Sequence, residues 1–526
     1  MNKVIAACLG LAFAGFLPGA SAEIVQGQLE LRWGDPVPLQ GKSQLPSLFI
    51  ATLVGDDGTR RVLDPAQARH AAGDLYALAN RRVAVEFSLA KRGGATLIAA
   101  IVPADRPQLP ALSKALLAPQ AVIGNTRWVT VACKFSDIVE EQKPITFFNG
   151  QYGTSSGQLG NYWKEVSYNK IDLTGSSAFG WFTLPQPRSF YIPPAADGEK
   201  PKANLDQLFK DCAAVADPQV NFNAVQGVNM MFNGDLDGYA WGGGACGILE
   251  GSNQCIRNTW NPPWSFGNLA PLAHEMGHGY GLPHSNNSDG DDDPYDNPWD
   301  VMSDGWSNAV SNPTYGALPK HINVRQRDRL GWIDAARKLT VPVGGSVREV
   351  VLDRASLLGS VNRQMIVLSL AAADAAGNVS YTVEARARPR VGIDDIACKP
   401  NCYEARLAGD AVIIHGIDAG GVAYSMDADV PPANISNNEG SMFKVGETWI
   451  SPDGSQKVQV LTATPNGFTV MIGNPRVTGG PLLPRGKPSA AVPAQSLPAS
   501  TESPRQRPGR GCEDARGAVR CKDQIR

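Results

Sequence analysis

Hydrophobic and polar residues follow three patterns along the chain, and each predicts a different kind of structure. Residues 23 to 120 hold short alternating runs such as QLELRW and RRVAVEFSLA, which predict a β-rich domain. From 123 to 337, apolar runs of strand length mix with helical spacing. From 338 to 474, alternating runs return between Gly, Asp and Asn turns, which predicts a β-sandwich. We therefore expect several domains, with an α+β domain between two β domains.

The central region predicts both strands and helices. The segments RWVTVACKF and GVNMMF are short and apolar, as buried strands are. The stretch GYAWGGGACGILEGSNQC is typical of a hairpin. INVRQRDRLGWI predicts a short helix that ends near Gly331. Two further helices are predicted by apolar residues at i, i+3, i+4 and i+7, namely Leu159, Tyr162, Trp163 and Val166, and Leu205, Leu208, Phe209 and Cys212.

The two ends differ from the rest of the chain. Residues 1 to 22 combine a lysine, an apolar stretch and an Ala-Ser-Ala cleavage site, the pattern of a secretory signal peptide. Residues 475 to 526 are rich in Pro, Ser, Gly and Arg, which predicts an extended basic tail. No later stretch has the length and apolarity of a transmembrane segment. We therefore expect a secreted, extracellular protein, with passage through the periplasm if the host is bacterial.

Composition narrows the partners but not the chemistry. The chain is 43% hydrophobic and 19% charged, with a formal net charge of −2. These are the values of an ordinary globular protein, and they argue against nucleic acid as the main partner. We expect a monomer that acts on a protein or peptide substrate.

Removal of the signal peptide leaves eight cysteines, and an even number in an exported chain favours disulfide bonds. Three pairs are close in sequence, Cys246 with Cys255, Cys398 with Cys402, and Cys512 with Cys521. Cys133 and Cys212 remain, on a predicted strand and a predicted helix, where they can clamp two core elements. Spacing alone leaves the connectivity open.

Three of the six histidines fall within one eleven-residue segment, HEMGHGYGLPH. A helix capped by Asn268 places His274 and His278 one turn apart on the same face. Gly281 can adopt the left-handed conformation that ends a helix and turns His284 back toward the same point. Three imidazoles with an open fourth position predict a catalytic Zn²⁺ site.

Glu275 follows the first of these histidines and points away from the same ion. It can still reach a water molecule bound to that ion. We expect Glu275 to be the general base, which takes a proton from the water and passes it to the leaving amine.

Acidic residues crowd the segment SNNSDGDDDPYDNPWD, which follows the third histidine. Neighbouring carboxylates repel one another unless a cation lies between them. A Ca²⁺ site and a solvated acidic loop are both open interpretations. The aspartates are Asp289, Asp291, Asp292, Asp293, Asp296 and Asp300.

HEMGHGYGLPH fits the pattern HExxHxxGxxH, and the chain resembles the metzincin zinc peptidases. The segment PWDVMSDG is similar to their Met-turn, and the resemblance to secreted peptidases of the gametolysin and immune inhibitor A type extends over about 123 to 474. Some metzincins have Tyr two residues after the Met, where this chain has Asp304 and Tyr295 is the nearest substitute. The resemblance implies three metal ligands, a base and a hydrophobic floor, which are His274, His278, His284, Glu275 and Met302.

The resemblance also implies where a substrate binds. In metzincins a peptide lies extended along an edge strand above the active-site helix and pairs with it through backbone hydrogen bonds. The best candidate is the segment before the helix, although its glycines can also simply make a turn. The candidate residues are Tyr239, Trp241, Gly242, Gly243, Gly244 and Ala245.

Together these features predict a secreted zinc endopeptidase that hydrolyses extracellular proteins, with residues 23 to 120 as a possible propeptide. No cysteine lies between Glu23 and Ala132, so latency would need a carboxylate or steric cover. Two other functions stay open. One is a metzincin-fold protein that binds a surface or glycan through 338 to 474 and cleaves few (glyco)proteins. The other is a zinc hydrolase of a non-peptide bond.

Overall fold

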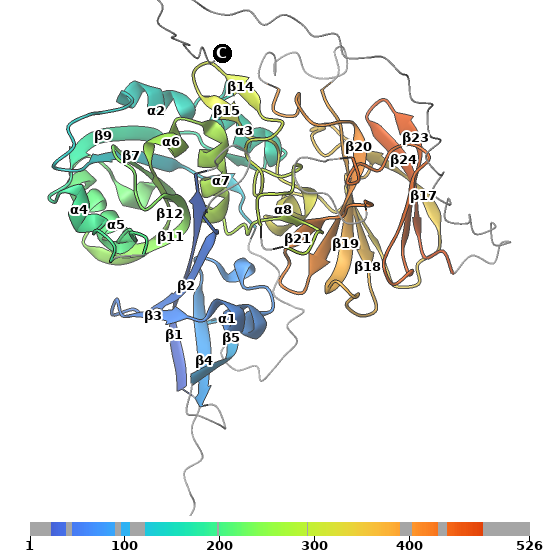
Figure 1. Cartoon of the computed structure of the whole chain (residues 1–526), viewed down its shortest axis with the longest axis horizontal. Helices are drawn as coiled ribbons and strands as arrows, with labels where there is room; N and C mark the ends of the chain where they lie inside the picture. Colours follow the sequence, from blue (N-terminus) through green and yellow to red (C-terminus); the bar gives the residue numbers. More distant parts are fainter. Residues whose placement is uncertain are drawn as a thin grey trace, which may run out of the picture. The chain divides into compact units, whose positions relative to one another are not determined.

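A computed structural model of the chain describes residues 23–37, 45–89, 96–105, 121–196, 199–291, 293–389, 402–429 and 439–476. All of these belong to one compact unit that ends at Thr478. It is a mixed α/β structure built on several sheets (Figure 1). The predicted signal peptide and almost all of the predicted basic tail lie outside the described residues.

The largest sheet has ten strands, and its middle consists of segments from the central region. The two apolar runs form buried strands, as predicted, which are β7 (Trp128–Lys134) and β10 (Gly227–Phe232). The two strands are parallel neighbours in the sheet. The Gly-rich stretch forms the antiparallel hairpin β11 (Tyr239–Leu249) and β12 (Ser252–Asn261). β12 pairs with β10, and β9 (Ser177–Thr183) pairs with β7.

Helices cover both faces of this sheet because its central strands are apolar on both sides. Val129 and Val131 share a core with α5 (Leu205–Ala216). Trp128 and Ala132 face the opposite way and share a core with the helices α3 (Leu159–Val166) and α7 (Leu269–Gly279). The residues of both predicted helical stripes are buried. The remaining elements are α2 (Ile145–Gln151), α4 (Arg188–Tyr191), α6 (Pro263–Phe266), α8 (Val324–Arg329), β6 (Gly124–Asn125), β8 (Ile171–Asp172), β13 (Asn286–Asn287), β14 (Val310–Asn312) and β15 (Gly316–Leu318).

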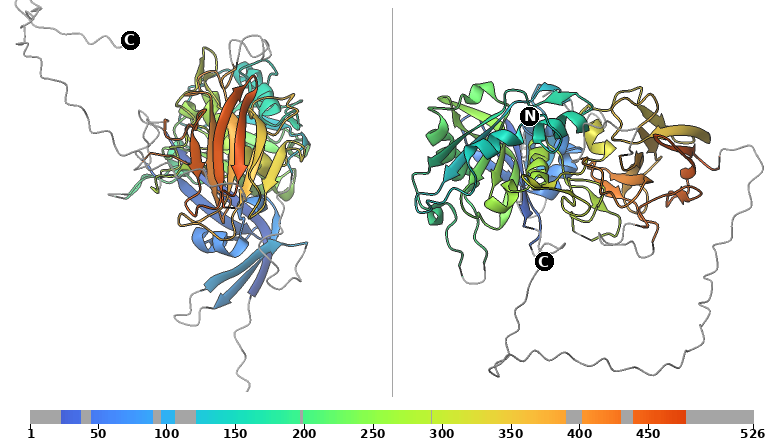
Figure 2. Two further views of the ribbon diagram at one scale, coloured as in Figure 1. Left: turned by 90° about the vertical axis from the view of Figure 1, so that its right-hand side faces the viewer. Right: turned by 90° about the horizontal axis from the view of Figure 1, so that it is seen from above.

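The N-terminal strands extend the same sheet. β1 pairs with β11, so the strand order runs β3-β2-β1-β11-β12-β10-β7-β9 without a break. A small core of its own lies between these strands and α1. The sheet therefore crosses the predicted boundary near residue 120. The N-terminal strands are the blue elements in Figure 2. The elements are β1 (Glu23–Pro36), β2 (Leu48–Val54), β3 (Arg60–Leu63), α1 (Pro65–Ala72), β4 (Arg82–Leu89) and β5 (Thr96–Pro103).

The C-terminal strands form two further sheets that share one core. Sheet order is β13-β21-β20-β19-β18-β16 in one and β17-β24-β23-β22 in the other. β13 comes from the central region, directly after His284, and pairs with β21. The strands are β16 (Lys338–Val341), β17 (Arg348–Asp353), β18 (Met365–Ser369), β19 (Asn378–Arg386), β20 (Ala411–Asp418), β21 (Ala423–Ser425), β22 (Thr448–Ile450), β23 (Lys457–Thr464) and β24 (Gly467–Gly473).

Two disulfides are present among the described residues. Cys246–Cys255 closes the β11–β12 hairpin, and Cys133–Cys212 joins β7 to α5, as the sequence predicts. Such bonds fit an extracellular protein. Cys398, Cys512 and Cys521 lie outside the described residues, so the other two pairs stay predictions.

Replacing both Cys133 and Cys212 by Ala should lower the free energy of unfolding by about 2–5 kcal/mol, since this bond closes a long loop between two core elements. Urea unfolding followed by circular dichroism measures the change. The same double substitution at Cys246 and Cys255 is the control. Its loop has a sequence separation of 9 rather than 79, so removal of this disulfide should lower the free energy of unfolding by less.

Candidate metal centre

Helix α7 carries the first two histidines and ends as predicted. Gly281 has φ 88°, and its N–H donates to His278 O while Leu282 N–H donates to Gly277 O. This left-handed turn sends the chain back toward the helix. One prediction is wrong. Asn268 occupies the N-cap position, but its side chain accepts from Ala317 N–H instead of capping the helix.

The three histidines converge. His278 Nε2 lies 3.0 Å from His274 Nε2 and 3.2 Å from His284 Nε2. Nitrogens bound to a tetrahedral zinc at about 2.0–2.1 Å lie roughly 3.3 Å apart, so this spacing suits one small cation.

The hydrogen bonds behind the rings also favour a metal. His274 Nδ1 lies 2.6 Å from Val301 O, and His278 Nδ1 lies 2.7 Å from Leu282 O. A carbonyl oxygen can only accept, so both Nδ1 atoms carry the hydrogen, and in the neutral rings both Nε2 atoms present a lone pair. Buried lone pairs that face one another repel unless a cation lies between them. The residues present therefore fit a metal ion.

A fourth side chain, which the sequence did not predict, reaches the same point. Asp35, near the end of β1, places Oδ1 2.7 Å from His284 Nε2 and Oδ2 3.2 Å from His278 Nε2. Its Oδ2 is also 3.5 Å from His274 Nε2. Asp35 and the three histidines form one group of potential metal ligands. The predicted open fourth position is therefore filled by a carboxylate.

One signal for Asp35 was present in the sequence. Leu29, Leu31, Trp33 and Asp35 occupy alternate positions of β1, and all four are buried. A carboxylate that continues the buried face of a strand needs a partner with positive charge or hydrogen-bond donors. The pattern could have marked Asp35 as unusual, but not which partner it has.

Glu275 lies beside this group and is 1% exposed. Its Oε2 has no hydrogen-bond partner. Gly242 on β11 packs against it, since a Cβ added there would lie 2.8 Å from Oε2. Burial raises the pKa of Glu275 well above its usual range, and the nearby Asp35 carboxylate raises it further. Glu275 thus sits between α7 and β11, next to the converging nitrogens.

Met302 packs against α7. Hydrogen bonds fix the turn that contains Met302. A Cβ on Gly277 would lie 2.3 Å from Met302 Sδ, so sulfur and helix are in close contact. Asp300 accepts from Met302 N–H and from Ser285 Oγ–H. Asp304 lies elsewhere, where it accepts from Trp306 N–H and pairs with the buried Lys320.

Tyr295 lies at the site itself. Its hydroxyl donates to Asp35 Oδ1 over 2.5 Å, and its ring packs edge-on against His284 at 5.3 Å between centroids. From the sequence, Tyr295 was only a weak substitute for a Tyr two residues after the Met.

The candidate substrate segment forms the first seven residues of β11, and its glycines lie within the strand rather than in a turn. Gly243 has φ 143°, and a Cβ there would lie 2.0 Å from Leu31 O of β1. Gly244 lies against the side chain of Asn80, whose Oδ1 would be 2.2 Å from an added Cβ. Gly243 thus lets a neighbouring backbone approach closely, and in this structure that backbone is β1.

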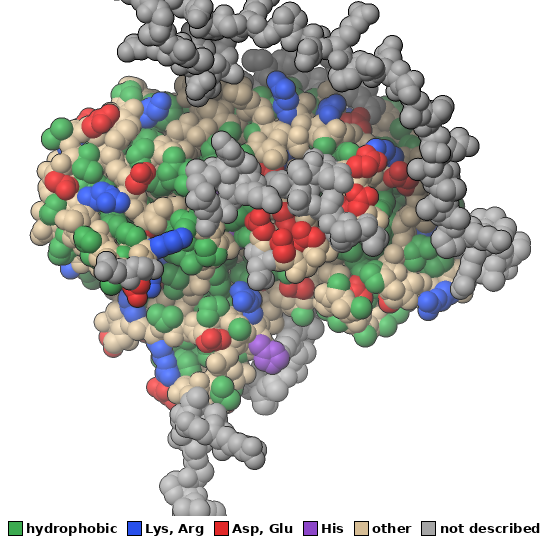
Figure 3. Space-filling model, viewed as in Figure 1, with side chains coloured by type: hydrophobic (Ala, Val, Ile, Leu, Met, Phe, Trp, Pro, Cys, Tyr) green, Lys and Arg blue, Asp and Glu red, His purple; other side chains and the backbone are tan. Residues whose placement is uncertain are grey.

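The acidic segment forms a second group of potential ligands. Oxygens of Asp289, Asp291 and Asp296 lie within 4.8 Å of one another. Asp296 is 4% exposed; one oxygen accepts from Asn287 N–H, and Oδ2 has no partner. Burial, and then the neighbouring carboxylates, raise the pKa of Asp296 to about 8. Acidic side chains gather near the centre of the face in Figure 3. Asp292 lies outside the described residues.

Comparison with known proteins gave no assignment: no family model matches the chain, and no curated protein matches its sequence. No helix among the described residues is long and apolar enough to cross a membrane. The function therefore has to be argued from the site.

Proposed function

We propose that the protein is a secreted zinc endopeptidase of the metzincin type. One observation carries the proposal: three histidine Nε2 atoms converge on one point, with the carboxylate of Glu275 beside it. This combination provides metal ligands and a proton acceptor in one place, and hydrolysis by an activated water needs both.

The proposed roles follow from the contacts. His274, His278 and His284 would hold Zn²⁺, which lowers the pKa of a bound water and polarises a carbonyl. Glu275 takes the proton from the water and delivers it to the leaving nitrogen. Met302 supports the helix from below. The Tyr295 hydroxyl, which now donates to Asp35, is placed to donate to a developing oxyanion instead.

The substrate is proposed to lie along β11. A peptide there can pair with the backbone of Tyr239 to Ala245, of which β1 pairs with Tyr239 to Gly243 in this structure. Backbone pairing reads no side chain, and Gly242 and Gly243 offer none, so we expect broad sequence tolerance.

We propose Ca²⁺ as a second ion, held by Asp289, Asp291 and Asp296. The unpartnered Oδ2 of Asp296 supports this, because a buried carboxylate oxygen needs a partner. The ion would fix the chain between His284 and Met302, and so would support the metal centre indirectly.

Calcium binding by the metal-free chain should be lost in Asp296→Asn. Isothermal titration calorimetry measures it, and the exposed Asp217 gives the control substitution Asp217→Asn. The variant His274→Ala should still bind Ca²⁺. Equal calcium binding by Asp296→Asn and the wild type would leave the acidic segment as a solvated loop.

The proposed function is tested by protein digestion with metal analysis. The chain should bind one zinc ion. An unfolded substrate such as casein should be cleaved by the Asp35→Ala variant, which lacks the carboxylate that lies against the three histidines. A chelator should stop cleavage, and added Zn²⁺ should restore it. A zinc-loaded variant that cleaves no protein or peptide would overturn the proposal, and cleavage of a non-peptide ester by it would favour another zinc hydrolase.

A further inference from the structure

β1 occupies the place proposed for the substrate. Arg32 pairs with Gly243 and Pro36 with Tyr239, in an antiparallel register of five residues. Because side chains alternate along a strand, Trp33 and Asp35 face α7 while Arg32 and Gly34 face the other way. β1 thus places Trp33 and Asp35 on the side of the sheet that faces α7, and Arg32 on the opposite side.

The face toward α7 covers the metal centre. Asp35 lies against all three histidines, and Trp33 stacks on His278 with 4.6 Å between ring centroids and 6° between planes. Trp33 is held by Phe49 and Tyr76, at 5.1 and 6.0 Å. His284, the most exposed of the three histidines, is only 8% exposed. A peptide has no access to the site.

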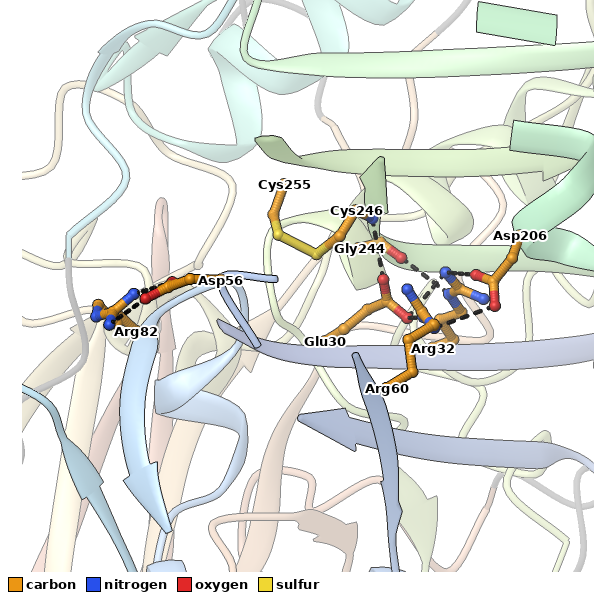
Figure 4. Close-up of a disulfide and its surroundings, with 9 residues drawn as sticks. All are labelled: Glu30, Arg32, Asp56, Arg60, Arg82, Asp206, Gly244, Cys246 and Cys255. Atoms are coloured by element: carbon orange, nitrogen blue, oxygen red, sulfur yellow. Dashed lines mark hydrogen bonds and ion pairs between the residues drawn. A yellow bond between two sulfur atoms is a disulfide. The ribbon is translucent and has the colours of Figure 1, made fainter. Parts of the chain in front are cut away.

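The other face and the edge of β1 fasten it to the central region (Figure 4). Arg32 Nη2 lies 2.7 Å from Asp206 on α5, and Arg32 Nε donates to Gly244 O. Glu30 Oε2 accepts from Cys246 N–H over 3.0 Å. These contacts hold the strand in register without touching the histidines.

The closed site cannot carry out the proposed reaction. A tetrahedral zinc ion with four protein ligands has no position for a water molecule, and four side chains here lie close enough together to hold one ion. Glu275 then has no water to act on. Either the site is structural, or the strand must leave before the site can work. The buried Glu275 beside the four groups, which a structural metal site would not need, favours the second interpretation.

The N-terminal strands can separate from the central region as one folded unit. Their core consists of buried residues from Leu29 to Ile101. They hold to the rest of the chain through the strand pair β1–β11 and the polar contacts of Glu30 and Arg32. Asp74 also pairs with Arg329, and Asn80 donates to Gly279 O. Loss of these contacts would expose the site and leave the N-terminal core intact.

We propose that the chain inhibits itself through β1. Asp35 supplies the fourth ligand at the metal centre, and residues Arg32 to Pro36 occupy β11 where a peptide substrate would pair. This regulation rests on the proposed peptidase function. The site opens when β1 separates from β11.

The ligand role of Asp35 is tested without any assay of activity. The full chain is loaded with Co²⁺ in place of zinc, and its visible absorption is compared with that of Asp35→Ala and Asp35→Asn. Both variants should change the spectrum, because a carboxylate leaves the ion. They should also release zinc to a chelator about 10–100-fold faster. An unchanged spectrum and an unchanged release rate would overturn the assignment of Asp35.

The role of the strand is tested by Arg32→Glu, which places a third carboxylate beside Glu30 and Asp206. This variant and Asp35→Ala should cleave a fluorogenic peptide about tenfold faster than the wild type or more, because a larger fraction of molecules is open. The control is Arg82→Glu. Arg82 pairs with Asp56 away from β11, so its loss should leave the rate unchanged (Figure 4).

The outcomes separate the two proposals. A wild-type chain that cleaves as fast as Asp35→Ala and Arg32→Glu would overturn self-inhibition and leave the peptidase function standing. A changed cobalt spectrum with no cleavage by any variant would overturn the peptidase function and, with it, self-inhibition. It would leave Asp35 as a ligand of a structural metal site. Because Arg32→Glu can fail to fold, Asp35→Asn, which keeps the side-chain size, is measured beside it.

Discussion

Glu275→Gln should lower kcat/KM by roughly a thousandfold or more while the zinc content stays at one ion per chain. The side chain lies beside the four groups that could hold a metal ion and is not one of them. Its amide analogue keeps the size but cannot accept the proton of the water. The loss combines that of general base catalysis with the lost orientation of the water.

This variant is best compared in two backgrounds, the wild type and Asp35→Ala, so that self-inhibition does not hide the effect. Peptide hydrolysis gives the rate, and atomic absorption gives the zinc content. Glu141→Gln, at an exposed ion pair with Lys134, is the matched control. Near-normal turnover by Glu275→Gln would remove Glu275 from the mechanism, and loss of zinc would make it a ligand instead.

His284→Ala should abolish activity and lower bound zinc to well below one ion per chain. Two histidines and a carboxylate would remain in the closed form, and only two protein ligands once β1 leaves. Two ligands are fewer than the three that hold catalytic zinc in proteins. The effect on binding should therefore be strongest in the Asp35→Ala background.

Metal content after dialysis against a weak chelator measures this loss. The control is His70→Ala, an exposed histidine on α1 that is distant in sequence from the motif. Full zinc occupancy in His284→Ala with Asp35→Ala would contradict the assignment of the third ligand. His274→Ala and His278→Ala should behave like His284→Ala, because all three Nε2 atoms share one point.

Local periodicity was enough to place α7 and its two histidines, since a spacing of four residues is one helical turn. Gly281 predicted the turn that brings the chain back toward the helix, because few other residues adopt its φ of 88°. The buried strands β7 and β10 were likewise evident from their apolar runs. Each of these features depends on residues that are neighbours in sequence.

Asp35 could not be placed in this way. It is separated from His284 by 249 residues, and the two meet only because β1 pairs with β11. No local pattern sets which strands pair, or in what register, between distant segments. Tyr295 was underrated for a related reason, because its distance to the site depends on how the acidic loop folds. Asn268 shows the converse, a local capping signal overridden by a tertiary contact with Ala317.

The pairing of β13 with β21 bears on where this protein can be divided. Asn286, two residues after the third histidine, is matched with Tyr424 in the C-terminal half. The same half contacts the segment just before Met302. Trp299 Nε1–H donates to Ser441 Oγ, and Arg386 donates to Trp299 O. The C-terminal strands are therefore scaffolding for the metal centre rather than a detachable accessory. A chain shortened to end near residue 337 would keep every proposed zinc ligand but lose the β13–β21 pairing, which holds the segment after His284 in place.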